Sequence, residues 1–389
     1  MRLLKILLKG VAALLLLAVV ALYVSGNSHV LRGVRCTYLV GKSKPDIDDM
    51  AYFDVSKIAA SNPMAWPVHQ KYNLGKIPSE YMPELDSLGT TALLVFRHDS
   101  LLFEQYWRKF DEHTVCNSFS VAKSFTAMLI GKAIDDGFIQ NMDQPVGDFI
   151  PEFKEGKNAT LTIRQLMQMA SGIPFGESYN SPFGFMAKAY YGEELTEETM
   201  KFRVEKEPGT FWTYEGGNTI LLGLILKKAT GKTPSDYFAE SFWGPMNAAD
   251  HAYWNLDHEG GLEKTFTGFY ATARDFARIG KLYMHRGVWN GDTLLSPDFV
   301  DACLQPNMIP DVDGEPCYWY GLHWWLGEQN GQKFFSCRGL RGQYIVGIPD
   351  AGLVIVRLGH LQRKDRTAHM PPDLFMYMDI ARSIAAQTN

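Results

Sequence analysis

The sequence predicts an α/β protein of the α+β type, in which an antiparallel sheet is flanked by helices and interrupted by an inserted, mostly helical region. Two apolar runs, 91–96 and 101–107, flank the polar turn 97–100 and predict a hairpin. Further β-rich runs lie near the other end, at 318–326, 332–337, 343–348 and 353–358. Strands at both ends with helices between them indicate one sheet built by both ends of the chain.

Helix signals dominate the middle of the chain. Thr162 and Gln165 form a capping box, in which the threonine caps the helix and the glutamine bonds back to it. Similar helix starts occur at Thr233, Thr272 and Ser296, and helices are expected over 125–134, 218–230 and 373–387. Gly231 suits the left-handed residue that ends the second of these helices.

Length and composition describe a globular protein with three segments. The chain has 389 residues, 46% hydrophobic and 21% charged, which is enough for a large core. We expect an N-terminal segment over 1–26, an irregular wrapping segment over 27–88 and a main domain over 89–389, with the helical insertion at about 137–260. The net charge is −5 and the basic residues are dispersed, which argues against nucleic-acid binding.

The first 26 residues have the pattern of an export signal. Arg2, Lys5 and Lys9 precede the uncharged apolar run Val11–Val24, which ends at Ser25. The alternative is a buried N-terminal helix. Export predicts a protein that is periplasmic, or anchored to the membrane and facing the extracytoplasmic side. The sequence fits both cleavage as a signal peptide and retention as a membrane anchor through residues 1–26.

Cysteine usage offers a candidate disulfide and no metal site. The five cysteines are Cys36, Cys116, Cys303, Cys317 and Cys337. An odd count in an exported protein leaves at least one thiol free, and Cys303 and Cys317 are candidates to pair. No C-x-x-C or clustered histidine pattern is present, so we expect neither a metal nor another cofactor.

Ser120 and Lys123 form an S-x-x-K pair at the start of an expected helix. Residues three apart share one helix face, so the two side chains lie within reach of each other. A lysine accepts a serine proton when burial or nearby positive charge lowers its pKa. Taken alone, the pair is also what a solvent-facing helix with an ordinary serine and lysine contains.

Five further segments accompany this pair in a fixed order. They are 161–174, 208–214, 217–223, 271–280 and 339–343. With Ser120–Lys123 they resemble the serine β-lactamase-related family, which includes class C β-lactamases, D,D-peptidases, esterases and amide hydrolases. The resemblance covers about residues 85–360 and implies a β-lactamase/transpeptidase-like fold. It is strongest to the 6-aminohexanoate-dimer hydrolase and esterase branch, judged by 271–275 and 342–346.

The resemblance implies a role for each matched residue. Ser120 becomes the acylated nucleophile, Lys123 its general base, and Tyr214 a proton relay to the leaving group. The backbone N–H groups of Ser120 and Leu340 form the oxyanion hole. Gly339 lets the strand approach the substrate, because it has no side chain. The alternative for Tyr214 is a packed core tyrosine.

Two positions depart from the family pattern. The third residue of the Y-x-N motif is Gly216, and Asn218 is a candidate to substitute for the missing asparagine. Residues 337–339 read Cys-Arg-Gly where the family has K-T-G or H-x-G, so the cation that meets a substrate carboxylate is missing from its place. Arg338 and Arg341 are candidates to supply that charge, with a solvated arginine as the alternative.

Aromatic residues are the remaining candidates for substrate binding. Tyr179 lies in the long segment 175–211, which we expect to cover the site, and Trp324 is a candidate apolar wall. Such aromatic side chains more often belong to the core. Cys337 is expected at the pocket edge as a small buried hydrophobic residue.

Three functions follow from these residues. The first is a serine hydrolase that cleaves a small ester or amide through an acyl-enzyme. The second is a D,D-peptidase or β-lactamase acting on cell-wall peptides or β-lactams, which the missing cation disfavours. The third, of another class, is an inactive binding or sensor module with the same fold, against which the joint presence of Ser120, Lys123 and Tyr214 argues. The sequence indicates no oligomeric state.

Overall fold

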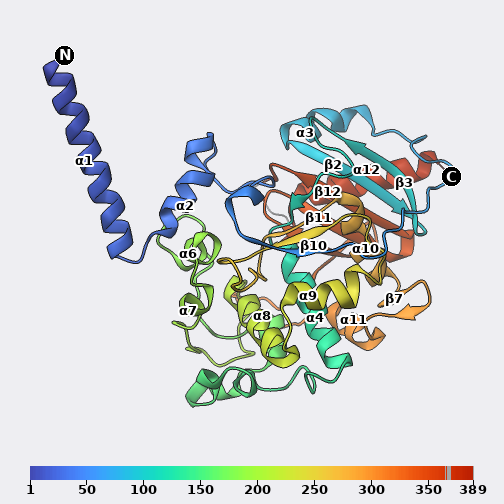
Figure 1. Cartoon of the computed structure of the whole chain (residues 1–389). Coiled ribbons are helices and arrows are strands. Elements are labelled where there is room, and N and C mark those ends of the chain that lie inside the picture. Colours follow the sequence, from blue (N-terminus) through green and yellow to red (C-terminus); the bar gives the residue numbers. More distant parts are fainter. Residues whose placement is uncertain (364, 366–368, 389) are drawn as a thin grey trace.

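A six-stranded antiparallel sheet forms the centre of the molecule (Figure 1). The computed structural model describes every residue except 364, 366–368 and 389. In hydrogen-bonded order the strands are β3 (Ser100–Tyr106), β2 (Thr90–Arg97), β12 (Leu353–Gly359), β11 (Gln343–Ile348), β10 (Gln332–Gly339) and β9 (Trp325–Gln329). The early hairpin pairs directly with the last strand, which confirms the expectation that both ends of the chain build one sheet.

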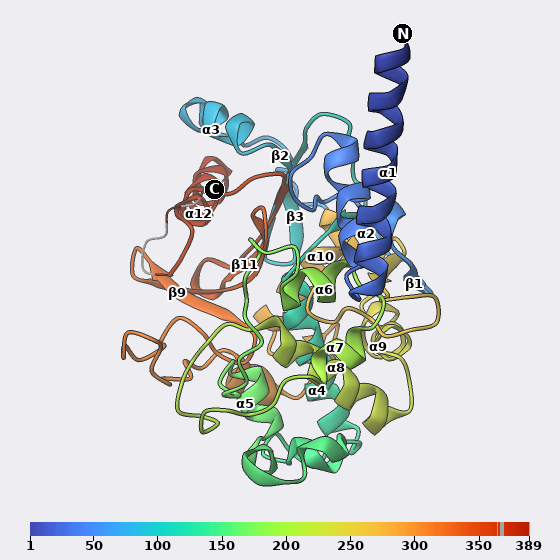
Figure 2. The same cartoon turned by 90° about the vertical axis from the view of Figure 1, so that its left-hand side faces the viewer.

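Helices cover both faces of this sheet. Along β2, Leu94 and Phe96 face one hydrophobic layer, while the alternate residues Leu93 and Val95 face the other. The first layer contains α4 (Val121–Asp135) and α10 (Ala273–Met284), and the second contains α3 (Met82–Ser87) and α12 (Pro372–Gln387). Figure 2 shows α10 and α12 on opposite sides of the strands.

The helical region lies beside the sheet and packs on α4. Its helices are α5 (Ile163–Met167), α6 (Phe185–Tyr191), α7 (Leu195–Thr199), α8 (Gly216–Thr230), α9 (Pro234–Phe238) and, later in the chain, α11 (Pro297–Cys303). Thr162 and Gln165 make the expected capping box, and Gly231 ends α8 with a φ of 69°. Short helical turns lie at Tyr38–Val40, Met50–Tyr52, Ser79–Tyr81, Val146–Asp148, Pro151–Phe153, Gly156–Thr160, Ala239–Trp243 and Pro349–Ala351.

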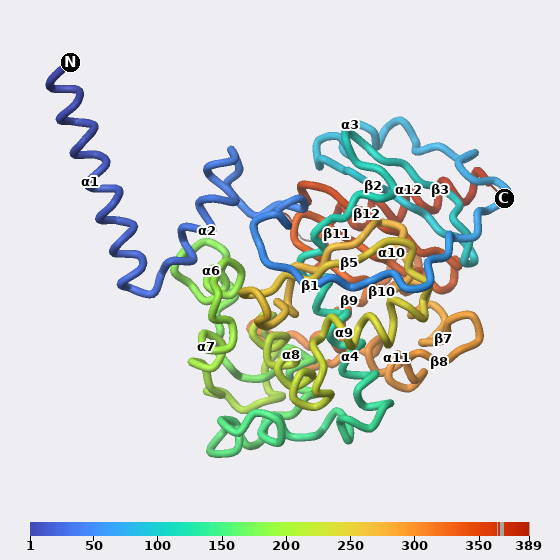
Figure 3. Tube along the Cα trace, viewed as in Figure 1, coloured from blue at the N-terminus to red at the C-terminus, as the bar shows by residue number. Residues whose placement is uncertain are grey.

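The wrapping segment is more regular than the sequence predicts. It holds α2 (His29–Cys36), β1 (Val55–Ile58) and α3, and Figure 3 shows it running past β5 before it reaches the hairpin. Strand β1 joins a second sheet in the order β1, β5 (Ala252–Asn255), β6 (Phe269–Ala271) and β4 (Cys116–Asn117). Because the partners of β1 come almost 200 residues later, local sequence does not reveal it. A third pair joins β7 (Val288–Trp289) to β8 (Asp292–Thr293).

Two local expectations are wrong. Residues 318–324 are not a strand, because the chain turns where Gly321 donates to Trp324 O and His323 adopts a φ of 59°. Cys303 and Cys317 are not paired, and all five cysteines are buried free thiols.

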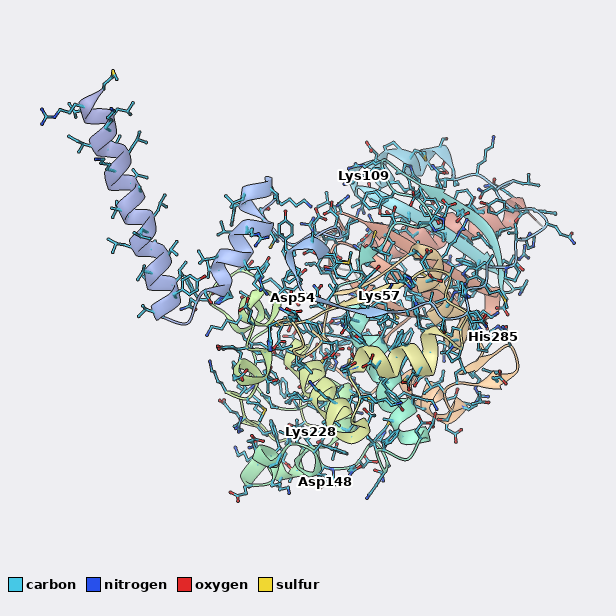
Figure 4. All side chains as sticks on the ribbon, in the orientation of Figure 1. Asp54, Lys57, Lys109, Asp148, Lys228 and His285 are labelled. Atoms are coloured by element: carbon cyan, nitrogen blue, oxygen red, sulfur yellow. The ribbon has the colours of Figure 1, made fainter. Side chains whose placement is uncertain are left out.

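An apolar helix, α1 (Arg2–Val24), precedes the folded body. It has no buried residue, and its length and hydropathy suit a membrane span or a signal sequence. Figure 4 shows this helix standing apart from the rest of the chain, with side chains on all sides of it. The labelled residues Lys57, Lys109 and Lys228 lie far apart over the body, so these cations do not form one basic stripe.

Candidate active site

Ser120 is the accessible position on an otherwise buried segment. It is the N-cap of α4, and all residues from Cys116 to Gly131 except Ser120 itself are buried. Helix α4 is apolar on all sides because the sheet, α8 and α9 surround it. The fold therefore presents the Ser120 hydroxyl at the N-terminus of α4, where the positive end of the helix dipole favours an anion.

Lys123 lies one turn along the same helix and reaches the serine. Its Nζ is 3.1 Å from Ser120 Oγ and 2.9 Å from the carbonyl oxygen of Phe266. The side chain is only 2% exposed, and Nζ also lies 5.0 Å from the centre of the Tyr214 ring. The structure thus brings the Ser120 hydroxyl and the Tyr214 ring together around the amine of Lys123. Phe266, which fixes that amine, was not identified from the sequence because its contact comes from backbone.

The start of α8 explains the missing asparagine of the Y-x-N motif. Gly216 N–H donates to Glu177 Oε2 at 2.6 Å, and a Cβ on Gly216 would lie only 3.3 Å from that oxygen. A side chain at 216 would therefore meet Glu177, as well as Met186 and Phe266 at 3.2 Å each. Asn218 is buried and donates to Met169 Sδ, while its Oδ1 has no hydrogen-bond partner among the residues that the structure describes.

Strand β10 approaches the start of α4 through its terminal glycine. A Cβ on Gly339 would lie 2.0 Å from the carbonyl oxygen of Ser118, so only glycine fits there. The next residue, Leu340, lies outside the ladder. Within the part of the chain that the structure describes, neither the Leu340 nor the Ser120 amide donates a hydrogen bond. Both N–H groups are available to a substrate oxygen.

Two buried side chains hold this turn from behind. Gln343 Nε2 donates to the carbonyl oxygen of Leu340 at 3.1 Å and to that of Gly359 at 2.7 Å. Arg357, fully buried, donates to the carbonyl oxygens of Arg341 and Gly342 at 2.8 Å each. Sequence reasoning missed both roles, since a polar residue within a strand carries no local sign of its partner.

The two candidate arginines are bound by the protein itself. Arg341 donates to the carbonyl oxygens of Pro45 at 2.5 Å and His360 at 2.6 Å, and lies 3.7 Å from Asp46. Arg338 stacks on Trp325, with its guanidinium carbon 3.8 Å from the ring centre. These contacts give Arg341 a structural role, because its guanidinium joins the turn to the wrapping segment.

The remaining candidates divide between surface and core. Tyr179 is 56% exposed and its hydroxyl donates to Glu177, beside the site. Trp324 is fully buried between Tyr283 and Phe335, so the expectation of a wall facing a substrate is wrong for this residue. Cys337 is also fully buried, which raises the pKa of its thiol.

A histidine close to Lys123 is unsuited to act as a base. Burial, with the charge of Lys123 second, lowers the pKa of His323 to about 3. Its Nδ1 lies 2.8 Å from Met167 O and its Nε2 3.0 Å from the Thr219 hydroxyl, so both nitrogens are occupied. Of these two groups, Lys123 is therefore the candidate to accept the Ser120 proton. Over the described residues, no cluster of His, Cys, Asp or Glu is arranged to hold a metal.

The chain is similar in sequence and in structure to known hydrolases. The chain is 25% identical over 329 residues to the 6-aminohexanoate-dimer hydrolase of Paenarthrobacter ureafaciens, covering 78% of this chain and 80% of the relative. It is similar in structure to a putative 6-aminohexanoate-dimer hydrolase from Bacillus anthracis, with a TM-score of 0.72, 21% identity and coverage of 92% and 95%. A family VIII carboxylesterase matches with a TM-score of 0.60, 16% identity and coverage of 80% and 99%.

The family itself follows from a match over most of the chain. A model of the beta-lactamase family matches residues 81–373, which include Ser120, Lys123, Tyr214 and the Gly339 turn. The fold is that of the serine hydrolases in this family, with amide hydrolases and carboxylesterases among its relatives. The chain belongs to the beta-lactamase family.

Proposed function

We propose that the protein hydrolyses a small ester or amide through an acyl-enzyme formed on Ser120. The observation that carries the proposal is the 3.1 Å contact between Lys123 Nζ and the accessible Ser120 Oγ. The two unengaged amides of Ser120 and Leu340 add a site for the oxyanion. A binding module has no need of this combination.

Acylation transfers one proton and exchanges one bond. Ser120 Oγ attacks the substrate carbonyl carbon while its proton passes to the Lys123 amine. The carbonyl oxygen becomes an oxyanion that accepts hydrogen bonds from the Ser120 and Leu340 amides. When the tetrahedral intermediate collapses, the C–O or C–N bond breaks, and Tyr214 passes the proton from Lys123 to the departing alcohol or amine.

Deacylation reverses the proton path with water as the nucleophile. Water attacks the Ser120 ester and gives its proton to the Lys123–Tyr214 pair. The second tetrahedral intermediate uses the same two amides, and its collapse returns the proton to Ser120 Oγ and releases a carboxylic acid. No further co-reactant is required.

Active-site labelling tests the nucleophile. A fluorophosphonate probe is expected to label the wild-type protein and to fail with Ser120→Ala, because the hydroxyl is the group that attacks phosphorus. Ser124→Ala is the matched control, since Ser124 lies on the same helix but donates to His323 O at 2.6 Å. The control should label normally. Folded wild-type protein that takes up no label would favour the inactive module.

Substrate choice is the second part of the proposal. The arginines near the strand turn are engaged by the protein, which favours acyl groups without a recognised carboxylate. We therefore expect p-nitrophenyl butyrate to be cleaved with a kcat/KM about 100-fold or more above that for nitrocefin, because a missing ionic contact commonly costs several kcal/mol. Nitrocefin turnover equal to that of the ester would instead favour a β-lactamase.

We also propose that the protein is exported and held at the membrane by α1. Support comes from the exposed apolar helix Arg2–Val24, none of whose residues contributes to the core. Expression of the full chain should place it in the membrane fraction with the catalytic domain accessible to protease from the extracytoplasmic side. An intact mass that lacks about 25 residues, in a soluble periplasmic protein, would show that the segment is a cleaved signal.

A further inference from the structure

A buried polar cluster lies directly behind the nucleophile. Asp49 accepts hydrogen bonds from the hydroxyls of Tyr270 at 2.6 Å and Tyr190 at 2.7 Å, and from Asn117 Nδ2 at 3.2 Å. The carboxyl group belongs to the wrapping segment, the asparagine to β4, and the tyrosines to β6 and α6. Asp49 is 2% exposed and Asn117 fully buried, so water does not replace these contacts.

The cluster ends on the residue before Ser120. Asn117 Oδ1 accepts a hydrogen bond from Phe119 N–H at 2.8 Å, and Phe119 adopts a φ of 49°. A left-handed conformation is unfavourable for a bulky residue and persists only when its surroundings hold it. The Phe119 ring also stacks on Tyr190, with ring centres 6.5 Å apart. This strained residue determines the direction in which the following Ser120 amide points.

Asp49 fixes which way the Asn117 side chain faces. Burial raises the pKa of Asp49, while the hydrogen bonds from Tyr270, Tyr190 and Asn117 favour its ionised form. A carboxylate only accepts hydrogen bonds, so it draws the Nδ2 side of the Asn117 amide toward itself and leaves Oδ1 for Phe119. The two tyrosine hydroxyls reinforce this choice. They accept from Asn117 Nδ2 at 3.1 and 3.3 Å while they donate to Asp49. Asn117 Nδ2 thus faces acceptors only, while its Oδ1 faces the Phe119 N–H donor.

The wrapping segment is bonded to the same strand through its backbone. Asn117 N–H donates to Ile47 O at 2.9 Å, and the neighbouring Ser118 N–H donates to Phe269 O at 2.8 Å. The backbone on both sides of Asn117 is therefore held by separate segments. What remains free to change is the side-chain amide, which Asp49 orients.

We propose that Asp49 is a positioning residue for catalysis, which acts through Asn117 and Phe119 to align the Ser120 hydroxyl and its oxyanion-hole amide. The inference rests on the proposed acyl-enzyme function. It assigns to the N-terminal wrapping segment a part in the chemistry, although no atom of Asp49 touches the substrate.

Asp49→Asn tests this role. The substituted amide offers one acceptor oxygen where the carboxylate offers two, so one of the three donors loses its acceptor and the hold on the Asn117 amide weakens. We expect kcat for p-nitrophenyl butyrate, per fluorophosphonate-titrated site, to fall about 10- to 100-fold, because misaligned oxyanion donors act in the transition state. KM should stay within about twofold.

A matched control separates positioning from stability. Asp373 is also a buried carboxylate that accepts a tyrosine hydrogen bond, from Tyr344 at 2.9 Å, but it lies at the start of α12. Asp373→Asn should lower the melting temperature and leave kcat per titrated site unchanged. Equal losses of kcat in the two variants, or a normal kcat in Asp49→Asn, would overturn the proposal.

An exchange of the two side chains supplies the rescue. In the double variant Asp49→Asn, Asn117→Asp, the aspartate at 117 offers one oxygen to the amide at 49 and the other to Phe119 N–H. This protein should recover at least fivefold of the lost kcat, and it remains decisive if the single variant does not fold. A folded exchange variant that is no better than Asp49→Asn would contradict the inference. Wild-type protein that takes no label contradicts the proposed function instead.

Discussion

The nucleophile end and the strand end of the site use their charged groups in opposite ways. At the nucleophile end, defined by Ser120 and Lys123, the amine is buried and its contacts are to the reacting hydroxyl and one carbonyl oxygen. At the strand end, defined by Arg338 and Arg341 beside Gly339, the cations contact an indole ring, backbone carbonyl oxygens and Asp46. The nucleophile end keeps its amine in position to exchange a proton with Ser120, whereas the strand end uses its cations to hold the fold together.

This contrast teaches that the two halves of such a site are separable. Gly339 still brings the end of β10 against the Ser118 carbonyl oxygen, as the proposed oxyanion hole requires. The side-chain cation that would bind a substrate carboxylate is missing from this strand. The backbone of the turn that follows is nevertheless held in place by Gln343 and Arg357. In the proposed acyl transfer, the strand end contributes only a backbone N–H group, and no side chain from it is required.

Removing the amine at the nucleophile end should have the largest effect. Lys123→Met keeps the length and apolar packing of the side chain but leaves Ser120 without a proton acceptor, so kcat should fall roughly a thousandfold. Lys132→Met is the control, because Lys132 lies on the same helix and pairs with Asp136 at the surface. Stopped-flow ester hydrolysis gives both values. A loss below tenfold in Lys123→Met would assign the base role elsewhere.

Removing a cation at the strand end should mainly cost stability. Arg341→Met loses hydrogen bonds to Pro45 and His360, and we expect about 2 kcal/mol less stability. KM for a neutral ester should change less than about twofold, since structural contacts are not substrate contacts. Thermal unfolding and steady-state kinetics measure the two effects.

An anionic substrate makes the same test sharper. If Arg341 recognised a substrate carboxylate, its loss would raise KM for a p-nitrophenyl ester of succinate about tenfold or more. That result would contradict the structural role assigned to the cations of the strand end. Arg286→Met is the control for charge alone. Arg286 pairs with Asp301 and is 59% exposed at its side chain, so its removal should leave stability and KM almost unchanged.

The sequence predicted the local parts of this site and missed the distant ones. The α4 start at Ser120 and the β10–β11 hairpin follow from local patterns and lie where expected. The contacts of Phe266 with Lys123, and of Asp49 with Asn117, join segments 143 and 68 residues apart. Nothing near either residue indicates its partner. Trp324 was misjudged for the same reason, since its burial depends on α10 and β10.

The smallest effect on turnover should come from Glu215, next to Tyr214 at the nucleophile end. Burial, and then the charge of Glu177, raises the pKa of Glu215 to about 8, so the carboxyl group is mostly neutral at pH 7. Glu215→Gln should therefore leave kcat near neutral pH almost unchanged, within about twofold.

The effect of Glu215→Gln appears instead in the pH dependence of stability. The unfolded carboxyl group releases its proton near pH 4.5 and the folded one near 8, so between these values the native state holds the extra proton. The free energy of unfolding of the wild type should thus fall as pH rises from about 5 to 8, and the glutamine variant should fall less. Glu205→Gln, at an exposed residue nearby, should follow the wild type. Melting temperatures at pH 5, 7 and 9 decide the question, because parallel curves for wild type and Glu215→Gln would mean that Glu215 is ionised in the native site.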